Sequence, residues 1–189
     1  MYKVLTAVDE VRVPPTKFDL DMEDGIKKSL AEQIEGKIDP ETGVFLAVTE
    51  ILDIGEGRII PEDGAVHYKT KFKVLAFVPE LNEMLPGLIV DITEFGAFAR
   101  IGPLDALIHV SQIMDDKISY NPKTANIIGK KTGKKVSTDD IIRARIVGVS
   151  LGTGGRSKIS LTMRQPTLGV LDWIDKEKRA ARKDAKKEK

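Results

Sequence analysis

The sequence contains no cysteine and only two histidines, His67 and His109. Without cysteine the chain can form neither a disulfide framework nor a thiolate metal site. Two histidines are also too few for a histidine-based metal cluster. We therefore expect neither a bound metal ion nor a cofactor.

The N-terminal segment lacks a long apolar run. Residues 1–13, MYKVLTAVDEVRV, contain no stretch long enough for a signal peptide or a membrane helix. The hydrophobic content of 41% is ordinary and allows a packed core. These features predict a soluble intracellular protein of the cytoplasm that has no membrane partner.

Catalytic motifs are lacking as well. No GxSxG elbow accompanies His109-Val110-Ser111, and the many carboxylates lie in turns without a spacing typical of paired metal ions. Gly55-Glu56-Gly57 is too short for a dinucleotide-binding fingerprint and favours a plain turn. We therefore expect a protein that is not itself an enzyme.

Charge is present in quantity but is divided unevenly. Residues 1–80 contain 10 Lys and Arg against 16 Asp and Glu, whereas residues 81–189 contain 20 against 13. The two parts therefore carry −6 and +7, within a whole-chain charge of +1. This asymmetry predicts two domains, 1–80 and 81–189, the second being the candidate for nucleic acid. A plainer alternative is that the eight basic residues from Lys176 onward only solvate a terminal tail.

Residues 1–80 combine strand patterns with one helix, which predicts a small α+β domain. The expected strands are Tyr2–Val13, Val44–Ile54 and Val66–Val78. A helix is predicted over Met22–Glu35, capped by Asp21. Its expected buried face consists of Met22, Ile26, Leu30 and Ile34. The expected connections are a tight turn at Gly55-Glu56-Gly57 and a hairpin turn at Asp63-Gly64.

Residues 85–114 show the two-residue period of strands. Leu88, Val90 and Ile92 alternate with Ile89, Asp91 and Thr93, and a bend is expected at Phe95-Gly96. Beyond the bend, small and aliphatic side chains are expected to face the core and the others to face outward. The inward set is Ala97, Ala99, Ile101 and Ile108, and the outward set is Phe98, Arg100 and His109.

The rest of this half adds two strands around a polar insertion. The fourth strand is expected over Ile141–Val149, with Ile142, Ala144 and Ile146 inward and Arg143, Arg145 and Val147 outward. A glycine-rich loop, residues 152–156, should lead to the fifth strand. There, Ile159, Leu161 and Met163 should face inward and Lys158, Ser160, Thr162 and Arg164 outward. A long loop is predicted over residues 115–140, with a short helix near Thr124–Ile128.

The insertion carries a lysine cluster, and the C-terminal segment carries the chain's one tryptophan. Lys130, Lys131, Lys134 and Lys135 would either be solvated surface or contact a phosphate backbone. Trp173 should pack against the rest of the domain. The tail from Lys176 onward should form no regular structure other than a helix.

The outward side chains have the chemistry that single-stranded nucleic acid requires. Aromatic rings stack with bases, and arginine or lysine tracks the backbone. Phe95 and Phe98 are the candidate stacking residues, although one of them could instead plug the barrel end. Arg100 is expected to lie beside Phe98. His109 is expected either to contact the ligand or to make a structural hydrogen bond.

These residues carry a family resemblance. The string FGAF, followed by IGPLDALIHVSQI and KISLTMR, resembles the RNA-binding domain of the ribosomal-protein-S-one type, an all-β five-stranded OB-fold barrel. The resemblance implies RNA contacts for Phe95, Phe98 and His109, and Lys158 stands where the family often has arginine. Ser150 departs from the family's frequent aspartate, and the insertion after Met114 is atypical.

The whole chain resembles the family of the E-prime subunit of archaeal-type RNA polymerase, which includes the seventh-largest subunit of eukaryotic RNA polymerase II. Strings that carry this resemblance include YKVLTAVDEVRVPP, LDALIHVSQIMDD and LTMRQPTLG. It implies a truncated ribonucleoprotein-like front domain that docks on the polymerase core. It also implies a heterodimer with the polymerase's F subunit and a stalk that receives nascent single-stranded RNA. The implied docking tip is Gly55, Glu56, Gly57 and Arg58.

Two other functions remain open from the residues alone. The barrel could belong to an RNA-binding subunit of an exosome or of a translation-initiation complex. Alternatively, the chain could be a scaffold whose outward aromatic side chains contact a polypeptide.

Overall fold

The computed structural model describes residues 1–122, 124–152 and 157–187. The chain forms two compact units, which we call the sheet unit and the barrel unit. Residues 1–78 form the body of the sheet unit, and the barrel unit comprises residues 79–150 and the chain from Ser157 onward. Within the described ranges, no helix has the length and apolar character needed to cross a membrane.

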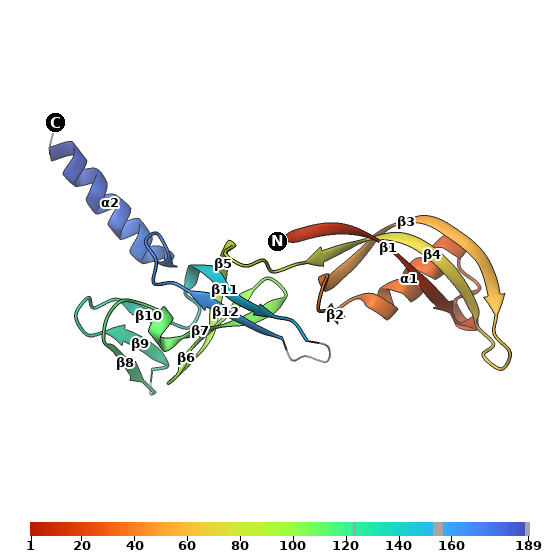
Figure 1. Ribbon diagram of the computed structural model, residues 1–189, viewed down its shortest axis with the longest axis horizontal. Helices are drawn as coiled ribbons and strands as arrows, with labels where there is room; N and C mark the ends of the chain where they lie inside the picture. The colour runs from red at the N-terminus through yellow and green to blue at the C-terminus, as the bar shows by residue number, and fades with distance from the viewer. Residues whose placement is uncertain (123, 153–156, 188–189) are drawn as a thin grey trace. The chain divides into compact units, whose positions relative to one another are not determined.

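The sheet unit contains four strands, one α-helix and one 3₁₀ helix (Figure 1). Their bounds are β1 Tyr2–Val13, η1 Pro15–Lys17, α1 Met22–Ile34, β2 Ile38–Asp39, β3 Gly43–Ile59 and β4 Val66–Phe77. The strands form an antiparallel sheet in the order β1-β4-β3-β2. The expected strand Tyr2–Val13 and the expected helix are both present, the helix ending one residue earlier than predicted.

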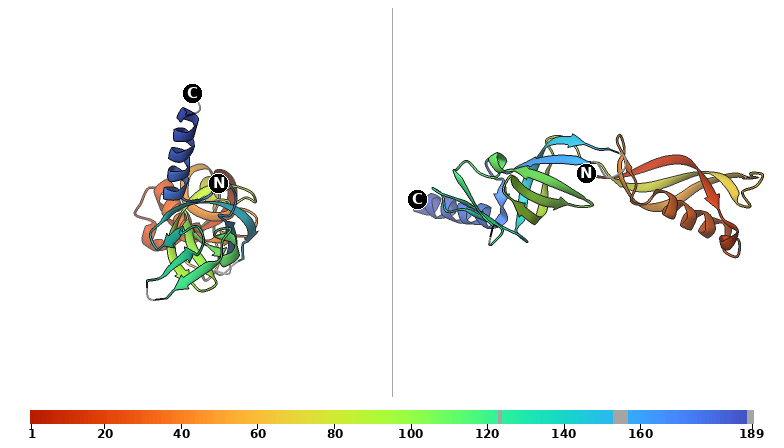
Figure 2. Two further views of the ribbon diagram at one scale, coloured as in Figure 1. Left: turned by 90° about the vertical axis from the view of Figure 1, so that its left-hand side faces the viewer. Right: turned by 90° about the horizontal axis from the view of Figure 1, so that it is seen from below.

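Helix α1 covers one face of this sheet (Figure 2). Ile26 and Leu30 are fully buried against Val11 and Phe72, which forms the core of the unit. The prediction that Met22 shares this buried face was wrong, because its side chain is 55% exposed. Met22 begins the helix and lies beside the loop residues Phe18 and Leu20, so the sheet does not cover it.

The turn predicted at Gly55-Glu56-Gly57 was wrong, because strand β3 includes these residues. The strand runs through these residues to Ile59 and stays paired with β4, with a register irregularity between Ile54 and Gly57. A Cβ on Gly55 would lie 2.9 Å from the Lys69 carbonyl oxygen, so glycine here permits a close approach of two backbones. The chain reverses farther on, in the loop between Ile59 and Val66 that contains Asp63-Gly64.

The barrel unit contains the remaining elements. They are β5 Met84–Thr93, β6 Gly96–Ile101, β7 Leu104–His109, η2 Val110–Gln112, β8 Ile118–Asn121, β9 Asn126–Gly129, β10 Lys135–Ser137, β11 Ile141–Ser150, β12 Lys158–Thr162, β13 Gly169–Val170 and α2 Leu171–Lys187. Strands β12-β7-β6-β5-β11 are hydrogen-bonded in that order, and pairing of β11 with β12 closes a five-stranded barrel. The predicted architecture, an α+β unit followed by an OB-fold barrel, is confirmed.

The barrel interior contains the predicted inward side chains. Buried residues of β6, β7, β11 and β12 are Ala97, Ala99, Ile101, Ala106, Ile108, Ile142, Ala144, Ile146, Ile159 and Leu161. Thr162, predicted to face outward, is buried and its hydroxyl donates a hydrogen bond to Gln112 Oε1 at 2.8 Å. The predicted loop 152–156 lies outside the described residues except for Gly152.

Strand β5 does not keep a single alternation. Ile89 and Ile92 are both buried, although an uninterrupted two-residue period would place them on opposite faces. The register with β6 shifts between Ile89 and Asp91, and this bulge changes the phase of the pattern. Leu88 and Val90, which flank Ile89, lie on the surface, and the bulge separates Ile92 from them by turning it inward.

The insertion after Met114 forms a small sheet instead of the predicted loop. Strands β8, β9 and β10 are antiparallel, so the short helix expected near Thr124–Ile128 was a wrong prediction. Ile127 and Val136 provide its fully buried apolar side chains. The Asp116 carboxylate accepts hydrogen bonds from the N–H groups of Lys131 and Thr132, which fixes the turn between β9 and β10.

Helix α2 follows directly from β13. Ile174 is buried, and the Trp173 ring packs against the backbone of Gly169, as predicted for the tryptophan. Lys176, where the charged tail was expected to begin, lies within this helix.

Candidate nucleic-acid interface

The outward face of strands β5, β6, β7 and β12 presents the candidate stacking residues. Phe98 lies opposite Asp91 on β5 and Leu107 on β7, and Leu107 lies opposite Ser160 on β12. These four positions form one row across the sheet. The row exists because inward alanines alternate with larger outward side chains on β6.

Phe95 and Phe98 form an aromatic pair on this face. Their ring centroids are 6.0 Å apart with an interplanar angle of 88°, an edge-to-face contact. Phe95 is 53% exposed and Phe98 is half-buried, so both rings keep accessible area. Gly96 makes the bend between them possible, because a Cβ there would collide with the Ile108 carbonyl. The bend predicted at Phe95-Gly96 is confirmed.

His109 stands at the end of β7, opposite Gly96 and therefore next to the aromatic pair. Its side chain is exposed, as the alternation predicted. Its Nδ1 lies 2.8 Å from Ser111 Oγ and accepts a hydrogen bond from the Ser111 N–H at 3.3 Å. The ring thus caps η2 with one nitrogen while it faces outward beside Phe95.

The two candidate cations differ in their surroundings. Arg100 Nε donates to Asp105 Oδ1 at 3.0 Å, directly across the β6–β7 pair. This hydrogen bond raises the pKa of the Arg100 guanidinium and partly neutralises its field. Lys158 is exposed, and within the described residues it has no ion-pair partner. It lies two residues before Ser160, at the level of Asp105 on β7.

The structure therefore assembles most of the predicted interface. Phe95, Phe98 and His109 gather at one end of the face, and Arg100 and Lys158 lie at the next outward level. Leu88, Val90 and Leu107 add apolar side chains to this face, and sequence reasoning did not assign the first two to it. Leu88 and Val90 flank the buried Ile89, whereas the bulge that follows turns Ile92 inward, a change of phase for which alternation alone gives no signal.

The predicted docking residues lie on the sheet unit, along β3. Gly55, Glu56 and Arg58 line a hollow of about 570 Å³ together with residues of β1 and β4. The β3–β4 loop beside it is braced by Asp63, which accepts from Arg12 Nε at 2.9 Å and lies 2.8 Å from His67 Nε2. The hydrogen bond from Arg12, followed by that from His67, holds the pKa of Asp63 well below its usual range.

Two family models match the chain. Residues 8–64 match the SHS2 domain found in the N terminus of Rpb7p and Rpc25p, and residues 78–164 match the S1 RNA-binding domain. The first match lies in the sheet unit. The second begins at Val78, the end of the 1–78 segment, and spans the barrel and its insertion.

Full-length relatives resemble the chain across both units. The DNA-directed RNA polymerase subunit Rpo7 of Saccharolobus shibatae is 36% identical over 180 residues, which cover 95% of this chain and 100% of the relative. Rpo7 of Sulfolobus acidocaldarius is 33% identical over 177 residues, 94% of this chain and 97% of the relative. Subunit rpb7 of RNA polymerase II from Schizosaccharomyces pombe is 24% identical over 163 residues, with coverages of 85% and 94%.

Proposed function

The chain belongs to the family of the archaeal RNA polymerase subunit Rpo7, and we propose that it is a non-catalytic stalk subunit that holds emerging single-stranded RNA. The observation that carries the RNA-binding role is the aromatic pair on the outer face of the barrel, formed by exposed Phe95 and half-buried Phe98. Bases stack on such rings, and Lys158, which has no ion-pair partner among the described residues, offers a cation for the backbone. The S1 RNA-binding model, which covers residues 78–164, supports the same interpretation.

The proposal includes a protein partner, the polymerase's F subunit, in a heterodimer. Strand β1 is twelve residues long and lies at the edge of its sheet, so one side of its backbone has no strand beside it within the described chain. Tyr2, Val4 and Val8 of this strand are exposed apolar side chains. An open edge with apolar side chains suits a second polypeptide better than it suits water.

The proposal also assigns docking on the polymerase core to the sheet unit. Gly55, Glu56, Gly57 and Arg58 remain the proposed contact segment, now as the last part of β3 before its loop. Ile59 follows them with 74% of its surface exposed, which supports a contact with protein at this end. We also propose that such an assembly operates in the cytoplasm.

The relatives favour this function over the exosome and translation-initiation alternatives. All the relatives described above are named as subunits of DNA-directed RNA polymerase, archaeal or eukaryotic. The match also extends through the sheet unit, whose model is described from polymerase subunits of the same kind.

A salt titration of RNA binding tests the stacking role. We expect Phe98→Ala in the full chain to weaken binding of a labelled single-stranded RNA by about 1–3 kcal/mol, with little change in the salt dependence. Phe18→Ala is the control, because Phe18 is also an aromatic residue with accessible area, 51% exposed, but lies on the sheet unit. Equal losses from both variants, or no binding by the wild-type chain, would contradict the proposal.

A further inference from the structure

A groove leads away from the aromatic pair to the start of helix α2. It consists of three adjoining hollows in the barrel unit. The first, of about 560 Å³, begins at Val110 and Ser111 beside His109 and reaches Arg164. The second, of about 250 Å³, shares Arg164 with the first and extends to Trp173. The third, of about 430 Å³, shares Trp173 with the second, so each hollow borders the next along one path.

Basic side chains line the whole length of this path. Lys117, Lys131 and Arg164 line the first hollow, and Lys134 lines the second and third. Two of these cations are paired with carboxylates, Arg164 with Asp115 and Lys134 with Glu177, and Asp116 accepts backbone N–H groups of the β9–β10 turn. Lys117 and Lys131 have no ion-pair partner within the described residues, so they are the cations of this stretch that can bind a phosphate backbone.

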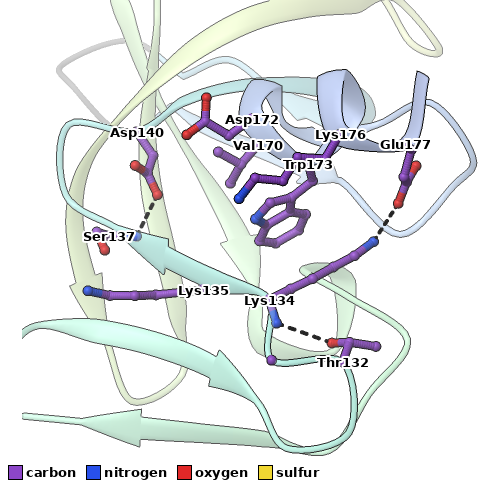
Figure 3. A pocket seen from close by; sticks show the side chains of 11 residues that line it. Thr132, Lys134, Lys135, Ser137, Asp140, Val170, Asp172, Trp173, Lys176 and Glu177 are labelled. Carbon is purple, nitrogen blue, oxygen red and sulfur yellow. Dashed lines mark hydrogen bonds and ion pairs between the residues drawn. The ribbon is translucent and has the colours of Figure 1, made fainter. Parts of the chain in front are cut away.

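The terminal pocket combines the chain's single tryptophan with lysines from two elements (Figure 3). Lys135 begins β10, Lys134 immediately precedes it, and Lys176 comes from α2. Figure 3 shows the indole ring in the middle of the pocket with the Lys176 amine beside it. An indole ring is a large stacking surface for a base.

The charges in this pocket are distributed so that two lysines stay available. Lys134 is engaged, because its Nζ lies 2.7 Å from Glu177 Oε1 and 5.3 Å from the centre of the indole ring. Asp140 is engaged as well, since it accepts the Ser137 N–H at 2.7 Å. Lys135 and Lys176 are exposed and have no ion-pair partner in the described part of the chain. Asp172, also exposed, can accept a hydrogen bond from a sugar hydroxyl or a base amino group.

We propose that this groove carries the RNA strand onward from the barrel face and that its terminal pocket holds one nucleotide. The base packs against Trp173 in place of the Lys134 amine, which now lies over the ring, and Lys135 and Lys176 bind the adjoining phosphates. This inference rests on the proposed function, because the strand reaches the groove from the Phe95–Phe98 face. It adds a second stacking site, built from the insertion and helix α2, beyond the outer face of the barrel.

Because Trp173 is the only tryptophan, intrinsic fluorescence reports directly on this pocket. The full chain is titrated with oligoadenylate of about 12 nucleotides, a length within the usual range for one OB fold. We expect the indole emission to be quenched as the RNA binds. Lys135→Ala and Lys176→Ala should each weaken the binding that causes this quenching by about tenfold, since each removes a charged contact to phosphate.

Two control variants separate a local contact from general electrostatics. Lys130→Ala removes a neighbouring exposed lysine that lines none of the three hollows, and it should change the titration little. Lys176→Arg keeps the charge and should restore most of the affinity. Equal losses from Lys130→Ala and Lys176→Ala would overturn the assignment of the pocket.

A parallel measurement of anisotropy with the same labelled RNA distinguishes this inference from the proposed function. If anisotropy rises to saturation while the Trp173 emission stays constant, RNA binds the barrel elsewhere and the groove inference fails alone. If neither signal changes, both proposals fail. A Trp173 signal that responds to polymerase core but not to RNA would assign the pocket to a protein contact and would also overturn the inference.

Discussion

The two units bury their apolar side chains in different ways. The sheet unit lays α1 against one face of an open sheet, and its edge strand β1 keeps Val4 and Val8 exposed. The barrel unit closes its sheet by pairing β11 with β12, so its interior needs no further cover. An open sheet with apolar surface is suited to a protein partner, whereas a closed barrel leaves its outer face free for a ligand.

The two units also differ in their charges. On the sheet unit, Lys73 pairs with Glu50 across β3 and β4 at 2.8 Å, and Arg12 pairs with Asp63 of the β3–β4 loop. On the barrel unit, Lys135, Lys158 and Lys176 are unpaired within the described residues. The −6 and +7 of the two parts of the sequence thus correspond to an excess of carboxylates on the sheet unit and to cations available to phosphate on the barrel unit.

The largest expected effect contrasts an aromatic core residue of the sheet unit with an aromatic surface residue of the barrel. Phe72 is 2% exposed, so Phe72→Ala should lower the free energy of unfolding of the sheet unit by about 3–5 kcal/mol. Phe98→Ala should cost only about 0.5–1.5 kcal/mol, chiefly its edge contact with Phe95. Denaturant melts of both variants measure the difference. If the Phe98 variant melts as early as the Phe72 variant, Phe98 is a core residue and the contrast fails.

The next effect concerns the partner of the sheet unit. The polymerase's F subunit, when present at about one hundred times its dissociation constant, should raise the free energy of unfolding by about 2.7 kcal/mol, because the partner binds only the folded chain. Light scattering should show a heterodimer in the same mixture. A chain that remains a monodisperse monomer with an unchanged melt would show that the open sheet needs no partner.

A smaller effect sharpens the comparison of paired and unpaired cations. Lys158→Ala should make the salt dependence of RNA binding shallower by about 0.7 in log–log slope, the contribution of one neutralised phosphate on a single strand. Arg100→Ala should change the slope less, because Asp105 already compensates this guanidinium. Salt titrations of the two variants measure the slopes, and a larger change for Arg100 would mean that its pair with Asp105 opens when RNA binds.

The smallest expected effect is on the pH dependence of stability, and it compares one carboxylate in each unit. The folded-state pKa values of Asp63 and Asp116 are both lowered, so each contributes stability above the unfolded pKa of about 3.9 that is lost as the pH falls below it. Asp63→Asn and Asp116→Asn should therefore destabilise the chain at pH 7 and differ less from wild type at pH 3.

The salt dependence of the destabilisation distinguishes the two carboxylates. Asp63 is held chiefly by the charged Arg12 side chain, whereas Asp116 is held chiefly by backbone N–H groups. High salt should thus reduce the effect of Asp63→Asn and leave that of Asp116→Asn nearly unchanged. Thermal melts at two salt concentrations provide the measurement, and equal sensitivity to salt would contradict this assignment of causes.

Local patterns in the sequence determined much of this protein. Strand β1, helix α1 and the inward alternation of Ala97, Ala99 and Ile101 were all predictable. Each depends on a periodicity that a few neighbouring residues express by themselves. The aromatic and basic candidates of the RNA-facing surface followed from the same alternation, read together with the family resemblance.

Other features depend on contacts between distant segments, and only the tertiary structure decided them. Strand β3 continues through Gly55 and Gly57 because β4 lies against it, and the insertion folds as a sheet because Asp116 binds the β9–β10 turn. The bulge in β5, where its register with β6 shifts, turns Ile92 inward although Ile89 is also buried. The groove toward Trp173 arises because the insertion and α2 line one path, although their residues are far apart in the chain. Periodicity describes which side of a strand a residue occupies, but not which distant segment will pack beside it.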